Sequence, residues 1–172
     1  MPSEMYDSAL ERAYEEQNLE EARRLLEAGA DPNDPLPLGR LVDRAVFDDR
    51  GDEWVKLFAL FGGAFDRSDE DGLTPLHHAA TRSDDPEVVR LLLGLGVQVS
   101  PRSPTGWTPL HFAAAYGHRL VSEALFEGGA DPCATTDEGL TASALAARNH
   151  HDELARRLDG VSSDRPVRRS VE

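Results

Sequence analysis

Six histidines and one cysteine are the residues of this chain whose types could support metal or acid–base chemistry. His77 and His78 are adjacent, so on a helix their side chains point about 100° apart, which suits chelation of one ion badly. His111 repeats the position of His77, and Cys133 has no histidine near it in the sequence. Without thiolate or carboxylate support at metal-site spacing, a metal-dependent or enzymatic role rests on the histidines alone.

Other motifs that carry chemistry are missing from the sequence. Asp69, Glu70 and Asp71 form an acidic run, but it lacks the alternating ligands and the distal glutamate of a calcium loop. The chain has no Gly-Lys-Ser phosphate loop, no nucleophile elbow and no Rossmann glycine set. We therefore assign no catalytic, cofactor-binding or metal-binding residue, and we expect no cofactor.

Charge indicates which partners the chain favours. The 172 residues carry a formal net charge of -14. Residues 1–85 hold 21 acidic and 9 basic residues, whereas residues 86–172 hold 11 and 9. Because like charges repel, this disfavours nucleic acid and anionic membranes as partners. It permits steering towards a basic protein, and the alternative is that the acidity only keeps the chain soluble.

The ends and the composition of the chain predict its compartment and its source. The N-terminus is acidic and lacks the apolar core of a secretory signal, and no stretch is long and apolar enough to cross a bilayer. Both features predict a cytoplasmic protein, and we expect a monomer. Arginine outnumbers lysine 17 to 1 and isoleucine is absent, which suggests a GC-rich, bacterial gene.

Two internal motifs recur with one period. Residues 72–80 read Gly-Leu-Thr-Pro-Leu-His-His-Ala-Ala, and related sequences return at residues 106–114 and, degraded, at 139–147. Gly-Ala-Asp-Pro at residues 29–32 returns at 129–132, with Gly62 and Gly96 at the intermediate positions. Both markers have steps of 33 or 34 residues, so the chain is a repeat array.

The repeats resemble those of the ankyrin-repeat family. The resemblance implies an all-α solenoid of about five helix-turn-helix units with short β-hairpin-like loops projecting at residues 66–71, 100–105 and 134–138. We expect an ankyrin-repeat domain over residues 1–160, with repeats at approximately 6–33, 34–66, 67–100, 101–133 and 134–160. Residues 161–172 are expected to form a flexible tail. Repeat two departs from the signature, with Arg40-Leu41-Val42-Asp43 in its place.

Local sequence signals explain how each unit would fold. Thr74 and Thr108 can cap the first helix of their repeats, and the prolines that follow fit its first position. Gly117 ends the first helix in repeat four, and Gly96 ends the second helix in repeat three. A single helix pair cannot bury its apolar face, so neighbouring units must stack.

The resemblance also assigns roles. His77 and His111 are expected to bridge the cap threonine and neighbouring backbone, and Trp54 is expected to pack in the core. The binding face is expected on the loop tips and the exposed side of the first helices. By phase it comprises Glu15, Glu16, Phe47, Asp48, Glu70, Asp71, Leu73, Arg82, Trp107, Tyr116, Leu140, Arg148 and Asn149.

These observations lead to a hypothesis of function. The chain is expected to be a non-catalytic protein–protein interaction module that binds a partner with a basic surface. One alternative is an inhibitor or antitoxin-like immunity protein that covers the basic active site of an enzyme. A second alternative, from another class, is the metal-dependent or enzymatic protein considered above.

Overall fold

The computed structural model describes residues 3–34, 40–48 and 51–163, and these residues form helices joined by turns and loops. Each repeat contributes a first and a second helix. In chain order the helices are α1 (Ser3–Glu15), α2 (Leu19–Glu27), α3 (Leu41–Phe47), α4 (Gly51–Leu60), α5 (Pro75–Arg82), α6 (Glu87–Gly94), α7 (Pro109–Tyr116), α8 (Arg119–Glu127), α9 (Ala142–Arg148) and α10 (Asp152–Ser163).

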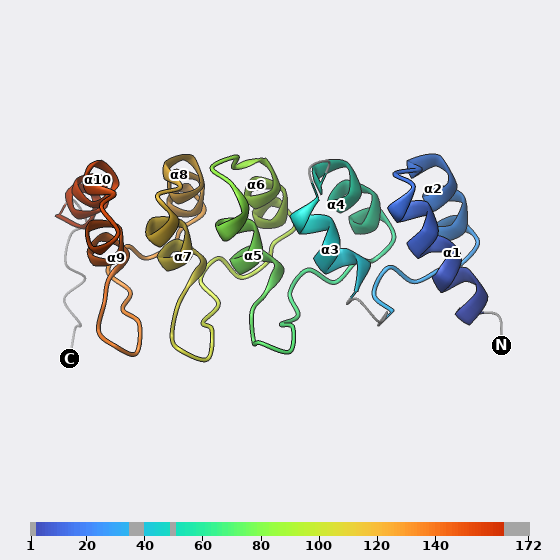
Figure 1. Ribbon diagram of the computed structural model, residues 1–172, viewed down its shortest axis with the longest axis horizontal. Helices are drawn as coiled ribbons and strands as arrows, with labels where there is room; N and C mark the ends of the chain where they lie inside the picture. Colours follow the sequence, from blue (N-terminus) through green and yellow to red (C-terminus); the bar gives the residue numbers. More distant parts are fainter. Residues whose placement is uncertain (1–2, 35–39, 49–50, 164–172) are drawn as a thin grey trace.

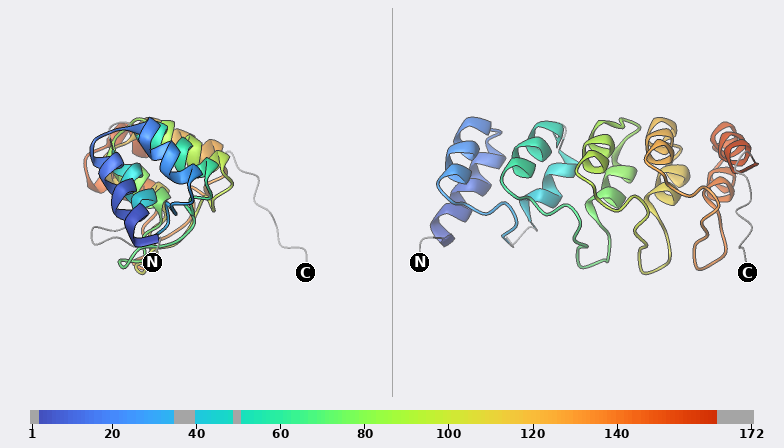
Figure 2. Two further views of the ribbon diagram at one scale, coloured as in Figure 1. Left: turned by 90° about the vertical axis from the view of Figure 1, so that its right-hand side faces the viewer. Right: turned by 180° about the vertical axis from the view of Figure 1, so that it is seen from behind.

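The helix pairs stand side by side in a single row, with the chain termini at opposite ends (Figure 1). First helices pack on first helices, from α3 through α5 and α7 to α9, and second helices pack from α2 through α4 and α6 to α8. The end-on view shows these two layers of helices (Figure 2). The loops that precede α5, α7 and α9 project along one edge of the row, as predicted. The all-α solenoid is confirmed.

The loops are hairpin-like in their course but contain little β structure. Within the described residues, the recorded β bridge is an isolated antiparallel one between Thr135 and Thr141. The loop before α7 is closed by a backbone hydrogen bond from the Ser103 N–H to the Trp107 carbonyl, 2.8 Å long. The loop before α9 is closed in the same way between Thr136 and Leu140, at 2.9 Å.

Helix boundaries follow the predicted signals. Helices α5, α7 and α9 each begin directly after a threonine: Thr74, Thr108 and Thr141. Gly117 ends α7 in the left-handed region, at a φ of 75°, which glycine adopts without the strain that a Cβ would add. The same turn contains Gln17 in repeat one and His150 in repeat five, with φ values of 54° and 66°. Helix α10 continues to Ser163, beyond the boundary at residue 160 that the sequence predicted, and residues 164–172 of the predicted tail lie outside the described residues.

Buried histidines join neighbouring repeats. His77 Nδ1 accepts a hydrogen bond from the Thr74 N–H at 3.0 Å, and its Nε2 lies 3.2 Å from the Trp107 carbonyl oxygen. Because Nδ1 is an acceptor, Nε2 carries the proton and donates. His111 has the same contacts with Thr108, and its Nε2 lies 3.1 Å from the Ala134 carbonyl and 3.2 Å from the Leu140 carbonyl. The predicted bridges are confirmed, and burial lowers the pKa of both histidines.

Repeat two uses an ion pair where repeats three and four use threonine and histidine. Arg40 Nε lies 2.8 Å from Asp43 Oδ2, and Arg40 Nη2 lies 2.9 Å from Asp43 Oδ1. Arg40 Nη2 also reaches the Arg67 carbonyl, at 3.4 Å, in the loop of the next repeat. This fork therefore makes the link to the following loop that the histidines make elsewhere in the row.

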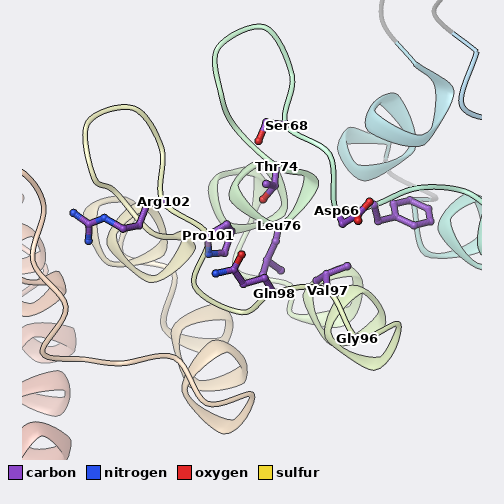
Figure 3. Close-up of a pocket in the computed structure, with 10 residues that line it drawn as sticks. Asp66, Ser68, Thr74, Leu76, Gly96, Val97, Gln98, Pro101 and Arg102 are labelled. Atoms are coloured by element: carbon purple, nitrogen blue, oxygen red, sulfur yellow. The ribbon is translucent and has the colours of Figure 1, made fainter.

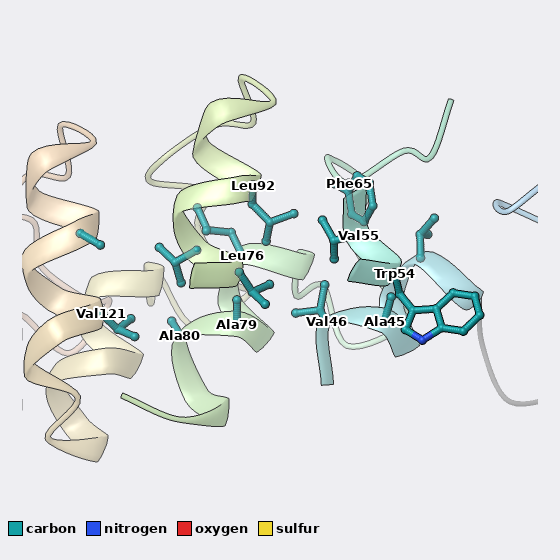
Figure 4. Packing of buried hydrophobic residues seen from close by; sticks show 14 of the residues in the cluster. Ala45, Val46, Trp54, Val55, Phe65, Leu76, Ala79, Ala80, Leu92 and Val121 are labelled. Carbon is teal, nitrogen blue, oxygen red and sulfur yellow. The ribbon is translucent and has the colours of Figure 1, made fainter. Parts of the chain in front are cut away.

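The core runs without interruption along the row between the two layers (Figure 4). Its largest side chain is Trp54, which is fully buried as predicted. The ring of Trp54 lies 4.8 Å from that of Tyr14 and 5.6 Å from that of Phe58, and its Nε1 donates to Gln17 Oε1 at 3.0 Å. The Tyr14 hydroxyl donates to Asp48 Oδ2 at 3.1 Å. Repeats one and two are thus held together by an aromatic cluster with its own polar network.

Candidate protein-binding surface

Phe47, His78 and Asp69 form a cluster where repeats two and three meet on the first-helix side. The rings of Phe47 and His78 lie 4.7 Å apart, and half of the Phe47 side chain is exposed. His78 Nε2 lies 2.6 Å from Asp69 Oδ2 in the loop that precedes α5. Asp69 also accepts hydrogen bonds from the N–H groups of Asp71 and Leu73. The cluster therefore fixes the acidic loop tip against the helix that carries His78.

Asp69 is held in its charged form by this arrangement. Partial burial opposes ionisation, but the hydrogen bonds from the Leu73 N–H and from His78 outweigh it and lower the pKa of Asp69. The neighbouring acids Glu70 and Asp71 are exposed at the tip of the loop. The tip thus exposes two further carboxylates next to Asp69, which is itself linked through His78 to the ring of Phe47.

Repeat four continues the apolar surface. The Trp107 ring lies 4.9 Å from the ring of Phe112, and both side chains are half-buried. The Phe112 ring lies 5.6 Å from that of His77, so it also touches repeat three. Tyr116, at the end of α7, is 59% exposed, and its ring stacks against that of His118 at 5.8 Å. We call Phe47, His78, Phe112, Trp107 and Tyr116 the aromatic row.

Both ends of the aromatic row carry charge. Glu15 and Glu16 are exposed at the end of α1, and Glu15 lies 3.6 Å from Arg44 of the next repeat. Arg44 is held more closely by Glu11, at 2.7 Å, and its guanidinium lies 5.1 Å over the Tyr14 ring. At the other end, Arg148 and Asn149 are exposed, and Asn149 donates to the Ala115 carbonyl at 2.8 Å.

Five of the predicted binding residues are less accessible than their phase in the repeat implied. The half-buried ones are Asp48, Leu73, Arg82, Trp107 and Leu140. Asp48 accepts hydrogen bonds from Tyr14 and, at 2.9 Å, from Gln17 Nε2. Burial, together with the neighbouring Asp48 carboxylate, raises the pKa of Tyr14. Asp48 therefore stabilises the junction of repeats one and two, because its carboxylate faces that junction.

Two members of the aromatic row, His78 and Phe112, were missed in the sequence. They occupy one repeat position, directly after the bridging histidine. The pattern of polar and apolar residues within one repeat does not show that this position is exposed, because the residues on either side of it are buried. Reading the position across repeats does mark it, since Arg44, His78 and Phe112 are all partly exposed.

Metal binding has no support in the geometry. Among the described residues, no group of three or more histidine, cysteine, aspartate or glutamate side chains converges as ligands would. His77 and His111 use their ring nitrogens in the bridges described above, and Cys133 is a free, exposed thiol. Within the same part of the chain, no helix has the length and apolar character that crossing a bilayer requires.

Comparison with known proteins gives the family. Residues 44–136, more than half of the chain, match the family model described as ankyrin repeats in three copies. The chain belongs to the ankyrin-repeat family. Ankyrin repeats are protein–protein interaction modules and generally a non-catalytic fold, so the first-helix face of this ankyrin-repeat chain is a candidate interaction surface.

Several relatives share this region. The chain is 38% identical over 93 residues to mouse protein phosphatase 1 regulatory subunit 27. That match covers 54% of this chain and 59% of the relative. It is 36% identical over 104 residues to human SH3 and multiple ankyrin repeat domains protein 2, covering 60% of this chain and 6% of the relative. It is 38% identical over 93 residues to human transient receptor potential cation channel subfamily A member 1. That match covers 52% of this chain and 8% of the relative. The match spans less than two thirds of each relative.

Proposed function

We propose that this ankyrin-repeat chain is a non-catalytic adaptor that binds a partner protein through the aromatic row and the acidic loop tip of repeat three. The partner carries a basic surface beside an apolar segment. The observation that carries this proposal is the exposure of Phe47 and Tyr116, 50% and 59%, on first helices that are otherwise packed side by side. Each ring contacts one histidine of the chain and still leaves half or more of its residue's surface free for a partner.

The chemistry of the surface supports this assignment. Tyrosine and tryptophan contribute much of the binding energy in protein interfaces, because they bury a large area and lose little conformational entropy. Glu70 and Asp71 are exposed at the loop tip of repeat three, and Glu15 and Glu16 are exposed at the end of α1. Charges at the rim of an interface raise the association rate of an oppositely charged partner, whereas desolvated rings at its centre govern dissociation.

An inhibitor role uses the same surface. The acidic residues would then cover the basic active site of a partner enzyme, and the partner's activity would fall on binding. The first 85 residues hold 21 acidic and 9 basic residues, which favours a basic partner in either role. Purification of the partner from the native host, followed by an assay of its activity with and without the chain, separates an inhibitor from an adaptor.

Binding kinetics test the surface directly. With a partner identified by pull-down and mass spectrometry, Glu70→Lys combined with Asp71→Lys should slow association about tenfold at low salt and weaken its salt dependence. Tyr116→Ala should instead speed dissociation about tenfold or more. Glu27→Lys combined with Glu153→Lys makes the same change of charge on the second helices and should leave both rates within about twofold. The surface assignment is wrong if the control pair alters the rates as much as the loop-tip pair does.

A further inference from the structure

One repeat position links repeat one to repeat two, and its occupant changes along the row. Counting by the period, this linker position holds Asn33, Asp66, Ser100 and Cys133. In repeat one the Asn33 amide reaches the next repeat: Nδ2 donates to the Gly62 carbonyl at 3.0 Å, and Oδ1 accepts from the Ala64 N–H at 2.6 Å. One side-chain amide thus satisfies a backbone acceptor and a backbone donor two residues apart.

Asp66 cannot make this link between repeats two and three. The equivalent backbone groups there are the Gly96 carbonyl and the Gln98 N–H, and an ionised carboxylate has no N–H to donate to the carbonyl. In the part of the chain that the structure describes, no hydrogen bond is recorded for the Asp66 side chain, the Gly96 carbonyl or the Gln98 N–H. Asp66, Gly96 and Gln98 are all exposed. The backbone groups that Asn33 satisfies one repeat earlier are therefore open to a partner here.

A groove opens at this junction. Two adjoining cavities, of about 460 and 330 Å³, share Phe65, Asp66, Gly96 and Val97 in their walls. Figure 3 shows the larger one between the loops, with Asp66 and Arg102 on either side and Gln98 between them. Its floor includes the apolar side chains of Phe65 and Leu76, which are almost fully buried. Gly96 is exposed, with a φ of 82° and no atom near the place of a Cβ.

The charged side chains of the groove favour a basic ligand. Arg102 is already engaged, since Nη2 lies 3.1 Å from Asp137 Oδ1 and Nη1 donates to the Thr135 carbonyl at 3.0 Å. Asp66 has no recorded ion pair among the described residues. The groove thus presents a carboxylate outside any ion pair among the described residues, one backbone acceptor and one backbone donor.

We propose that this flank groove between repeats two and three binds an extended peptide that carries a lysine or arginine. An extended residue presents its own N–H and C=O on one side, as in a β ladder, so one such residue of the ligand would take the place that Asn33 fills at the preceding junction. Its N–H donates to the Gly96 carbonyl, its carbonyl accepts from the Gln98 N–H, and a basic side chain of the ligand meets Asp66. This site is separate from the aromatic row and adds a second binding surface to the chain.

The substitution Asp66→Asn tests the premise. The new amide should link Gly96 and Gln98 as Asn33 links Gly62 and Ala64, which raises the melting temperature by about 2–4 °C. It should also fill the place of the ligand's backbone N–H and C=O. The converse substitution, Asn33→Asp, should lower the melting temperature by a similar amount. An unchanged or lower melting temperature for Asp66→Asn would contradict the equivalence of the two junctions.

A peptide selection tests the ligand. Linear twelve-residue peptides displayed on phage are selected on the full chain and counter-selected on Asp66→Asn. The expected peptides contain lysine or arginine, bind the native chain at least tenfold more tightly than Asp66→Asn, and lose that advantage when the contacting amide is N-methylated. Tyr116→Ala should leave their affinity within about twofold, which separates this site from the proposed adaptor surface. Recovery of no peptide, or of peptides that Asp66→Asn binds equally well, would overturn the proposal.

Discussion

In repeats three and four, a threonine and a histidine join each first helix to the loop that follows, whereas in repeat two an arginine and an aspartate do so. His77 and His111 reach the next loop through one neutral ring each, while Arg40 and Asp43 do it through a charged fork. The same helix geometry is thus held by two kinds of polar link. The link in repeat two needs a charged pair that is largely buried, and burial raises the pKa of Asp43 in spite of Arg40.

The apolar cores of the two halves also differ, in the size of the side chains that they bury. Repeats three and four pack small alanines between the first helices, including Ala79, Ala80, Ala113 and Ala114, all buried. Repeats one and two instead bury Trp54 and Phe58 under Tyr14, with Asp48 and Gln17 on the polar side of the cluster. A repeat array is stabilised by nearest-neighbour interfaces, so the halves can differ in stability while sharing one architecture.

The largest expected effect is at Trp54. Because its side chain is fully buried among rings, Trp54→Ala should lower the free energy of unfolding by about 3–5 kcal/mol. The loss should fall first on α1 to α4, since each repeat contacts only its neighbours. Urea denaturation gives the total, and native-state hydrogen exchange locates it. The control Trp54→Phe keeps most of the buried ring and should cost less than half as much. If Trp54→Ala reduces protection in α7 and α9 as much as in α1 to α4, the two halves do not unfold separately.

A somewhat smaller effect is expected at His111. His111→Ala would leave the Thr108 N–H and the carbonyls of Ala134 and Leu140 without their side-chain partner, at a cost of about 2–3 kcal/mol. His118 provides a matched control, because its ring makes one such bond, to the Ala80 carbonyl at 3.0 Å. His118→Ala should cost about 1 kcal/mol in the same denaturation experiment. Equal costs would mean that the bridge between repeats is not what His111 contributes.

The smallest expected effect is a dependence on pH that differs in sign between the halves. Burial lowers the folded-state pKa of His77 and His111 below the unfolded value of about 6.5. Their contribution is therefore complete above that value and is lost as the pH falls through the folded pKa. Asp43 has a raised pKa, so lowering the pH relieves its cost instead.

Hydrogen exchange at pH 7.5 and 5.5 would detect this difference, with protection of α5 and α7 falling more than that of α3. Arg40→Thr combined with Asp43→His rebuilds the threonine–histidine link in repeat two. This pair should transfer the histidine-like pH dependence to α3. A fall in protection that is equal in all first helices, both in the native chain and in the double variant, would contradict the proposed difference between the two kinds of link.

The repeat and the helix starts could be predicted from the sequence because each depends on a local signal at a fixed period, and the histidine bridges could be predicted from the resemblance to the ankyrin-repeat family. Thr74 and Thr108 are followed by proline, and Gly96 and Gly117 adopt the left-handed region that ends a helix. The Arg40–Asp43 fork carries no such signal, since it becomes a link only when Arg67 of the next repeat is placed beside it. The pairing of Tyr14 with Asp48 likewise depends on a neighbouring repeat, whereas that of His78 with Asp69 depends on how the loop of repeat three folds back onto α5.

The candidate surface could be predicted in outline and not in detail. Phase within the repeat placed Phe47, Tyr116, Glu70 and Asp71 on the outside, where they are exposed. It gave Asp48 the same assignment, although the packing of repeat one turns that carboxylate to Tyr14. Whether the surface binds a basic partner stays a prediction, and so do the repeat boundaries and a bacterial source.

Hydrogen–deuterium exchange of the chain with and without its purified partner tests the proposed binding surface most directly. The account predicts new protection in residues 66–73 and 100–107 and at the ends of α3 and α7, with α2, α4, α6 and α8 unchanged. Protection confined to the second helices, with the loops and the ends of α3 and α7 unaffected, would contradict it.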